Sequence, residues 1–187
     1  MISTMPGCFM TAASAHKPAV LIMSHIPSPV GNLHIATCDG ALCYLGFEHK
    51  GYREQMYEWL ARYLKIFEIK PEHGEHASIQ SQMEKYFQGS LKKFRVKTHL
   101  FGTDFQLQVW TALRVIPYGG TVSYRAIAEA IGNPDATRAV GGAVGKNPIS
   151  IIIPCHRVIG EDGSLTGYGG GIERKKKLLQ LEGAILV

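Results

Sequence analysis

The residues best suited to chemistry are a cysteine and a histidine side by side, Cys155 and His156, which follow the apolar run 149–153 and Pro154. A cysteine beside a base can act as a nucleophile, because the thiolate attacks and the thiol hardly does. Adjacent side chains on an extended segment point opposite ways, so we expect His156 to reach Cys155 through a water molecule. Glu182 is the candidate carboxylate to fix the imidazole tautomer from its other side. A chance pair with a buried structural thiol is the alternative on these residues alone.

Two short predicted helices precede this pair in the chain. Ser123 can cap a helix that runs through Ile131, and a second helix is expected from Asp135 to about Val144, after the turn 132–135. Two helices joined by a tight glycine-containing turn match the helix-turn-helix pattern, whose second helix often contacts DNA. An ordinary helical hairpin is the alternative for this segment taken alone.

Further elements of the C-terminal half are expected on both sides of these helices. Asp104 is predicted to cap a helix that runs to Val115. A glycine-rich loop over 160–171 and a basic helix over 173–182 end the pattern. The charge run 174–177 on that helix fits a solvated face, and its sign also suits a phosphate backbone.

The first hundred residues predict a small α/β unit. Alternating apolar residues indicate strands, apolar residues at helical spacing indicate helices, and Asp39-Gly40 is a hairpin turn signal. The expected elements are strands over 31–38, 41–47 and 94–100, and helices over 52–66 and 79–87. Nothing in this half demands chemistry.

Composition sets the class of protein. The 187 residues are 45% hydrophobic and 19% charged, which predicts a chain with a buried core. The net charge of +5 and the pI near 9.0 point weakly toward a polyanionic partner. The apolar stretch 19–23 is too short to span a bilayer and lacks the flanks of a secretory signal. Four cysteines without a CxxC pair predict free thiols in a reducing compartment.

A long ordered run, residues 138–158 (RAVGGAVGKNPISIIIPCHRV), resembles the signature of the O6-alkylguanine-DNA alkyltransferases. The resemblance covers residues 105–183 almost continuously, and residues 28–33 carry it more loosely. Its further matching positions are Val122-Ser123-Tyr124, Gly132-Asn133-Pro134, Gly160, Gly163, Thr166-Gly167-Tyr168, Lys175 and Leu181-Glu182-Gly183.

The resemblance implies an α+β fold with two domains. After a variable N-terminal extension over 1–24, we expect an α/β, ribonuclease-H-like domain over 25–101. A mainly helical, winged-helix-like DNA-binding domain that contains the helix-turn-helix is expected over 102–187.

The same resemblance implies DNA repair. The alkyl group of O6-alkylguanine, and also of O4-alkylthymine, would pass irreversibly to Cys155, once per molecule, after the base has rotated out of the duplex. The expected partner is double-stranded DNA that carries O6-alkylguanine, with no cofactor and no membrane. We expect a monomer in the cytoplasm, associated with the nucleoid in a prokaryote. The alternatives are a protein that binds the lesion without transferring it and a cysteine hydrolase.

Several residue roles also follow only from the resemblance. Arg138 would fill the space left by the flipped base, Tyr124 would help to protonate the leaving base, and Asn147 would brace the active-site turn. The main-chain carbonyls of Cys155 and Val158 would accept from the guanine amino group. The remaining implied roles are a DNA contact for Ser123, Arg125 and Asn133, a main-chain N–H toward O6 for Gly169, and a pocket wall for Tyr168.

This sequence departs from the family at two positions of the site. Gly169 stands where some relatives carry serine, which matters little if only the main-chain N–H is used. Ser150 stands where some relatives carry proline, so we expect the pocket rim to admit bulky alkyl groups differently.

The other cysteines raise the question of a metal. Some members of this family bind a structural zinc through cysteines and histidines, and zinc prefers a tetrahedral set of such ligands. The candidate ligands here would be Cys8, Cys38, Cys43 and His99, but their spacing is loose. We therefore expect free thiols and no metal.

Overall fold

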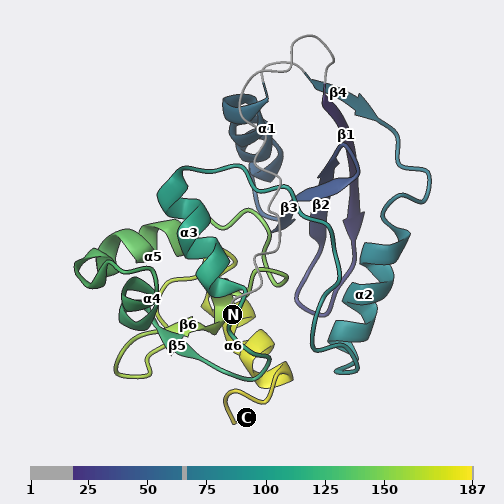
Figure 1. Cartoon of the computed structure of the whole chain (residues 1–187). Helices are drawn as coiled ribbons and strands as arrows, with labels where there is room; N and C mark the ends of the chain where they lie inside the picture. Colours follow the sequence, from purple (N-terminus) through teal and green to yellow (C-terminus); the bar gives the residue numbers. More distant parts are fainter. Residues whose placement is uncertain (1–18, 65–66, 187) are drawn as a thin grey trace, which may run out of the picture.

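The N-terminal half of the molecule is built on a four-stranded sheet (Figure 1). The computed structural model describes residues 19–64 and 67–186. The strand order is β3-β2-β1-β4, with β2 antiparallel to both of its neighbours and β4 parallel to β1. The strands are β1 (Ala19–Ile26), β2 (Leu33–Cys38), β3 (Ala41–Phe47) and β4 (Phe67–Lys70).

The predicted hairpin is confirmed. Asp39 and Gly40 both have positive φ, at 48° and 76°, as a type I′ turn requires. This turn matches the right-handed twist of β2 and β3 and sets their register.

One helix covers each face of the sheet. On one face, Met56 and Leu60 of α1 (Tyr52–Tyr63) pack in a small cluster with Cys38 and Cys43. On the other face, the buried residues of α2 (Ala77–Phe87) join the main core, which continues into the C-terminal half. Both helices were predicted, although the structure ends α1 earlier and begins α2 earlier than expected.

Two expectations for this half were wrong, and one strand was missed. β1 includes residues 19–24, which the sequence assigned to a variable extension, because this apolar run pairs with β2 and β4. β4 was not predicted at all. The segment 94–100 is not a strand: it forms a single bridge to β3, Leu42 to Thr98, through main-chain hydrogen bonds from Leu42 N to Lys97 O and from His99 N to Leu42 O.

A buried histidine ties α2 to the sheet. His76 is 0% exposed, and its Nδ1 lies 2.6 Å from Ser24 Oγ and its Nε2 3.0 Å from Thr37 Oγ1. Burial lowers the pKa of His76 below its ordinary value of 6.5, with Glu72 and Glu75 opposing the shift. The two hydroxyls therefore satisfy a neutral ring at neutral pH.

This histidine predicts acid sensitivity. Because its pKa is lowered in the folded state, the unfolded chain binds the proton more readily, and stability is lost as pH falls below about 6.5. In His76→Gln, we expect the unfolding free energy to depend less on pH between pH 7 and 5, by at most about 1.4 kcal/mol per pH unit. Urea titrations across that range measure the slope. His73→Gln, at an exposed neighbour, should leave it unchanged, and equal slopes in all three proteins would contradict the prediction.

The C-terminal half is mainly helical, as expected. The predicted pair of helices is present as α4 (Tyr124–Ala130) and α5 (Thr137–Gly145), and Ser123 caps α4 by accepting from Ala126 N at 3.1 Å. The other elements are α3 (Asp104–Leu113), β5 (Val122–Ser123), the 3-10 turns η1 (Pro134–Ala136) and η2 (Cys155–Arg157), β6 (Val158–Ile159) and α6 (Ile172–Leu181). No helix in the described ranges is long and apolar enough to cross a membrane.

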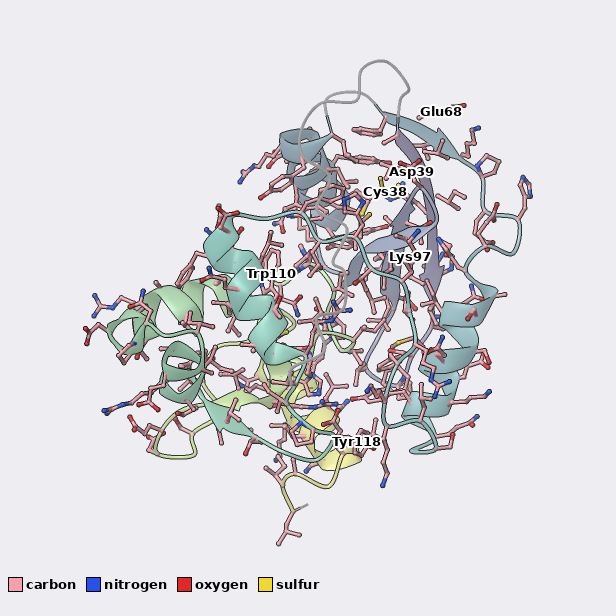
Figure 2. All side chains as sticks on the ribbon, in the orientation of Figure 1. Cys38, Asp39, Glu68, Lys97, Trp110 and Tyr118 are labelled. Atoms are coloured by element: carbon pink, nitrogen blue, oxygen red, sulfur yellow. The ribbon has the colours of Figure 1, made fainter. Side chains whose placement is uncertain are left out.

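Two helix starts differ from the prediction. Thr103, not Asp104, caps α3, because its hydroxyl accepts from Gln106 N while the Gln106 side chain accepts from Thr103 N. α5 begins at Thr137, after the 3-10 turn η1. Trp110 then holds α3 against α5, because its buried Nε1 donates to Ala143 O at 2.9 Å (Figure 2).

The two halves are joined by main-chain hydrogen bonds at β3. Leu45 N donates to Pro148 O, and Ser150 N donates to Leu45 O, both at 2.8 Å. The sheet therefore anchors the segment that leads to Cys155. Within this segment Ile151 has a φ of 70°, a conformation that is strained for a β-branched residue.

Candidate active site

The candidate nucleophile lies on a tight turn rather than on an extended segment. Cys155, His156 and Arg157 form the 3-10 turn η2, and β6, which follows, pairs in parallel with β5. The sequence-based picture of alternating side chains was therefore wrong at this point. Cys155 is only 5% exposed.

Asn147 braces this turn through both ends of its side chain. Its Nδ2 lies 3.0 Å from Cys155 Sγ and 2.8 Å from Ile153 O, and its Oδ1 accepts from Ile149 N at 3.0 Å. One amide side chain therefore fixes the loop 147–155 and donates to the sulfur.

The sulfur is held as a thiol until a base acts on it. Burial raises the pKa of Cys155 to about 11, while the hydrogen bond from Asn147 and the positive charge of Lys175 oppose the rise. A neighbouring base must therefore take the proton as the nucleophile forms.

His156 has the geometry of that base. It is 0% exposed, and its Nε2 lies 2.9 Å from Glu182 Oε1. A carboxylate only accepts hydrogen bonds, so Nε2 carries the proton and Nδ1 is the acceptor. Nδ1 is buried and has no hydrogen-bond partner among the described residues. Burial lowers the pKa of His156 against the opposing effect of Glu182, so the free imidazole is neutral and can accept a proton.

Glu182 is the buried anion of the site. Arg157 holds it with a bidentate fork, Nε to Oε2 at 2.8 Å and Nη2 to Oε1 at 2.9 Å. Burial on its own would raise the pKa of Glu182, but the hydrogen bonds from His156 and Arg157 outweigh it and bring the pKa to about 2. The expected orienting role of this carboxylate therefore has matching geometry.

Lys175 belongs to the site but was missed as a site residue. It is 0% exposed, and its Nζ donates to Val158 O at 2.6 Å and to Thr166 O at 2.7 Å. Burial lowers its pKa to about 8. The helical spacing of Lys175 with the buried Leu178 and Leu179 was the signal in the sequence that could have placed it on the inner face of α6.

The basic run 174–177 is therefore not a uniformly solvated face. Lys176 and Lys177 are exposed, but Lys175 is buried. Arg174 is half-buried and donates to Val30 O at 2.8 Å, so it links α6 to the N-terminal half.

Two tyrosines and the glycine-rich loop flank the sulfur. Tyr124 donates to Thr166 O at 3.2 Å and to Gly167 O at 3.3 Å. Burial raises the pKa of Tyr168, and the nearby Cys155 raises it further. The Tyr168 hydroxyl is buried without a hydrogen-bond partner in the part of the chain that the structure describes. Gly169, which follows it, is exposed.

The candidate DNA-contacting residues lie at the end of β5, on α4 and α5, and in the turn between these helices. Arg138, in the first turn of α5, and Asn133, in the turn, are exposed. The Ser123 hydroxyl is used by the cap of α4. Arg125 is shared between Glu129 at 3.1 Å and Glu161 at 3.8 Å, so part of its charge is already neutralised.

The structure gives no support to the zinc ligands considered from the sequence. Cys38 and Cys43 are buried in the cluster under α1, and Cys43 Sγ donates to Ala36 O at 3.3 Å. Among residues 19–64 and 67–186, no three histidine, cysteine or acidic side chains are grouped to hold a metal ion. Cys8 lies outside the described residues.

Comparison with known proteins covers both halves of the chain. Residues 104–184 match the family model described as "6-O-methylguanine DNA methyltransferase, DNA binding domain". Residues 21–100 match the model described as "6-O-methylguanine DNA methyltransferase, ribonuclease-like domain". These matches confirm the two-domain α+β fold expected from the sequence.

Individual relatives agree with the family models. A methylated-DNA–protein-cysteine methyltransferase of Mycobacterium tuberculosis is 48% identical over 157 residues, which are 84% of this chain and 89% of the relative. The crystal structure of the M. tuberculosis O6-methylguanine methyltransferase superimposes with a TM-score of 0.76 at 46% identity, covering 88% of this chain and 93% of that one. A structure of the M. tuberculosis protein in complex with DNA gives a TM-score of 0.75 at 45% identity, covering 88% and 93%. The chain therefore belongs to the 6-O-methylguanine DNA methyltransferase family.

Proposed function

We propose that this protein repairs DNA by transferring the alkyl group of O6-alkylguanine to its own Cys155. The observation that carries the proposal is the linked set Asn147–Cys155 and His156–Glu182, in a chain whose family acts on methylated DNA. O4-alkylthymine, which carries the same kind of alkyl–oxygen bond, is a second substrate under this proposal.

The reaction is a displacement at the alkyl carbon. The proton of Cys155 passes through a bridging water to His156 Nδ1, which is buried and accepts no hydrogen bond from the residues that the structure describes, and Glu182 stabilises the imidazolium. The thiolate attacks the alkyl carbon, a carbon–sulfur bond forms, and the bond from that carbon to O6 breaks. The guanine leaves as an anion and regains a proton with the help of Tyr124, whose hydroxyl lies at the glycine-rich loop. The substrate brings its own electrophilic carbon, so no cofactor takes part.

Each molecule reacts once under this proposal. To regenerate Cys155, water would have to attack the alkyl carbon of a neutral thioether and expel the thiolate, and none of the described groups placed around Cys155 activates that bond. The protein is consumed as it repairs, which distinguishes the proposal from a cysteine hydrolase with repeated turnovers.

The substrate base must leave the duplex to reach the sulfur, because O6 of a stacked guanine is not accessible to a buried thiol. We assign α5 to the DNA, with the exposed Arg138 in the space left by the base. The main-chain carbonyls of Cys155 and Val158 would accept from the guanine amino group. Lys175 supports this arrangement by holding Val158 O at 2.6 Å.

The setting of the reaction follows from the partner. We propose that the protein works as a monomer on double-stranded DNA in the cytoplasm, on the nucleoid in a prokaryotic cell. The free thiols of Cys38, Cys43 and Cys155 fit a reducing compartment.

Intact-mass measurement tests the proposal. After incubation with a duplex that holds one O6-methylguanine, we expect each protein molecule to gain one CH2 unit, and peptide mapping should place it on Cys155. An unmethylated duplex of the same sequence should give no change. A lesion-binding protein would bind the methylated duplex and keep its original mass, and a hydrolase would continue past one equivalent, so either result would refute stoichiometric transfer.

A further inference from the structure

A side chain of the N-terminal half reaches the anion that orients the catalytic histidine. Tyr86 of α2 is 0% exposed, and its hydroxyl donates to Glu182 Oε1 at 2.7 Å. The sequence assigned no chemistry to this half, and the contact joins residues 96 positions apart.

Glu182 receives more donors than its orientation requires. Oε1 accepts from Tyr86, His156 and Arg157, and Oε2 accepts from Arg157 and, at 3.3 Å, from Gly119 N. A carboxylate offers about four lone-pair sites, so these donors fill it. The fork from Arg157 already fixes the carboxylate plane, so the Tyr86 hydroxyl is not needed to orient it.

The remaining effect of the hydroxyl is on charge. Tyr86 donates to the same oxygen that accepts from His156, and each donor withdraws electron density from that oxygen. A less negative Oε1 holds the imidazolium of His156 less tightly. The imidazolium then loses its proton at lower pH, so the His156 ring is a neutral base over a wider pH range.

We propose that Tyr86 is a positioning residue through which the N-terminal domain lowers the proton affinity of His156. The inference rests on the proposed transfer reaction for its consequence, but the contact itself does not depend on that reaction. It gives the ribonuclease-like domain a part in the chemistry of Cys155.

Other charged and titratable groups face Glu182 and His156, and a test of Tyr86 must leave these groups unchanged. Arg157 and Lys175 both act on His156, and both lower its pKa. Tyr118 lies beside α6 (Figure 2), and its hydroxyl donates to Leu181 O at 3.1 Å rather than to the carboxylate. Lys92 Nζ lies 5.8 Å from the centre of the Tyr118 ring.

Tyr118 supplies a matched control. Tyr86→Phe and Tyr118→Phe each remove one hydroxyl near Glu182, but only the first removes a donor to Oε1. The Tyr86 ring packs against Phe87, Phe94 and Tyr118, and phenylalanine keeps those contacts.

The pH dependence of transfer is the main readout. In Tyr86→Phe, we expect the acid limb of the single-turnover rate constant to move up by about 0.5 to 1 pH unit, which slows transfer roughly three- to tenfold on that limb and leaves the plateau unchanged. Tyr118→Phe should follow the parent profile. NMR titration of the His156 ring in DNA-free protein should show the same upward shift. If neither the acid limb of the rate profile nor the His156 titration shifts and only the plateau rate falls, Tyr86 acts through packing alone and the inference is overturned.

A second variant keeps the inference testable if Tyr86→Phe fails to fold. Site-specific 3-fluorotyrosine at position 86 keeps the ring and hydroxyl but makes the hydroxyl a stronger donor, so the acid limb and the His156 titration should move to lower pH. A shift in the same direction as Tyr86→Phe would overturn the inference. If the parent protein transfers no methyl group, the proposed function fails, while the His156 titrations still decide the role of Tyr86.

Discussion

Replacing Cys155 with alanine is expected to abolish alkyl transfer completely while leaving the fold and the binding of alkylated duplex intact. The side chain is 5% exposed and fills little space, so losing the sulfur should cost about 1 kcal/mol of unfolding free energy. The chemical loss is total, because no other group at the site is placed to form the carbon–sulfur bond. Intact mass after incubation with methylated duplex measures transfer, and fluorescence anisotropy measures binding at fixed salt.

Cys43→Ala is the matched control for this substitution. Cys43 is also buried, but it lies in the cluster under α1 and donates to Ala36 O. This variant should gain one CH2 unit as the parent does. A mass gain in the Cys155→Ala protein, mapped to Cys38 or Cys43, would contradict the assignment of the nucleophile.

Replacing Glu182 with glutamine is expected to damage both stability and chemistry. The neutral amide leaves the buried Arg157 without its anion, and one partner lost from a buried pair typically costs about 3 to 5 kcal/mol. His156 also loses the group that fixes its tautomer and stabilises its imidazolium, so the rate of transfer should fall at least roughly a hundredfold. Urea unfolding and single-turnover kinetics measure the two losses. Glu173→Gln, at an exposed position in the first turn of α6, should change neither.

The acid limit of stability gives a second check on Glu182. Its pKa falls from 4.5 to about 2 on folding, so its stabilising effect is complete above about pH 4.5 and is lost as pH falls toward 2. The parent protein should lose stability through that window more steeply than Glu182→Gln. Parallel curves would mean that Glu182 is not the buried anion described above.

Local signals in the sequence predicted the elements they act on. Asp39-Gly40 specified the hairpin because a type I′ turn needs positive φ at both positions. Ser123 specified the start of α4 for a similarly local reason. The segment 94–100 alternates like a strand, but it meets β3 at one bridge only, and pairing is decided by the partner strand rather than by the pattern.

The candidate site was predicted in part. The residues themselves pointed to Cys155, His156 and Glu182, and the resemblance to the family added Asn147. The structure brings these four residues into contact as two pairs, Asn147 with Cys155 and His156 with Glu182. Their individual roles in transfer are still predictions. Helical spacing could have placed Lys175 on the inner face of α6, but local patterns could not assign the partners of Lys175 or of Tyr86, because each side chain bonds to another segment of the chain.

The contact between Tyr86 and Glu182 also has a consequence for how the molecule assembles. A contact between residues farther apart in sequence closes a longer loop, and the entropic cost of closure rises slowly with loop length. Glu182 lies 96 positions from Tyr86 in the sequence but only 26 positions from His156, which it orients. Closing the longer loop costs about 1 kcal/mol more in chain entropy, so the pair His156–Glu182 is the less costly contact, and the full set of donors to Glu182 requires the sheet domain to be folded against the C-terminal helix.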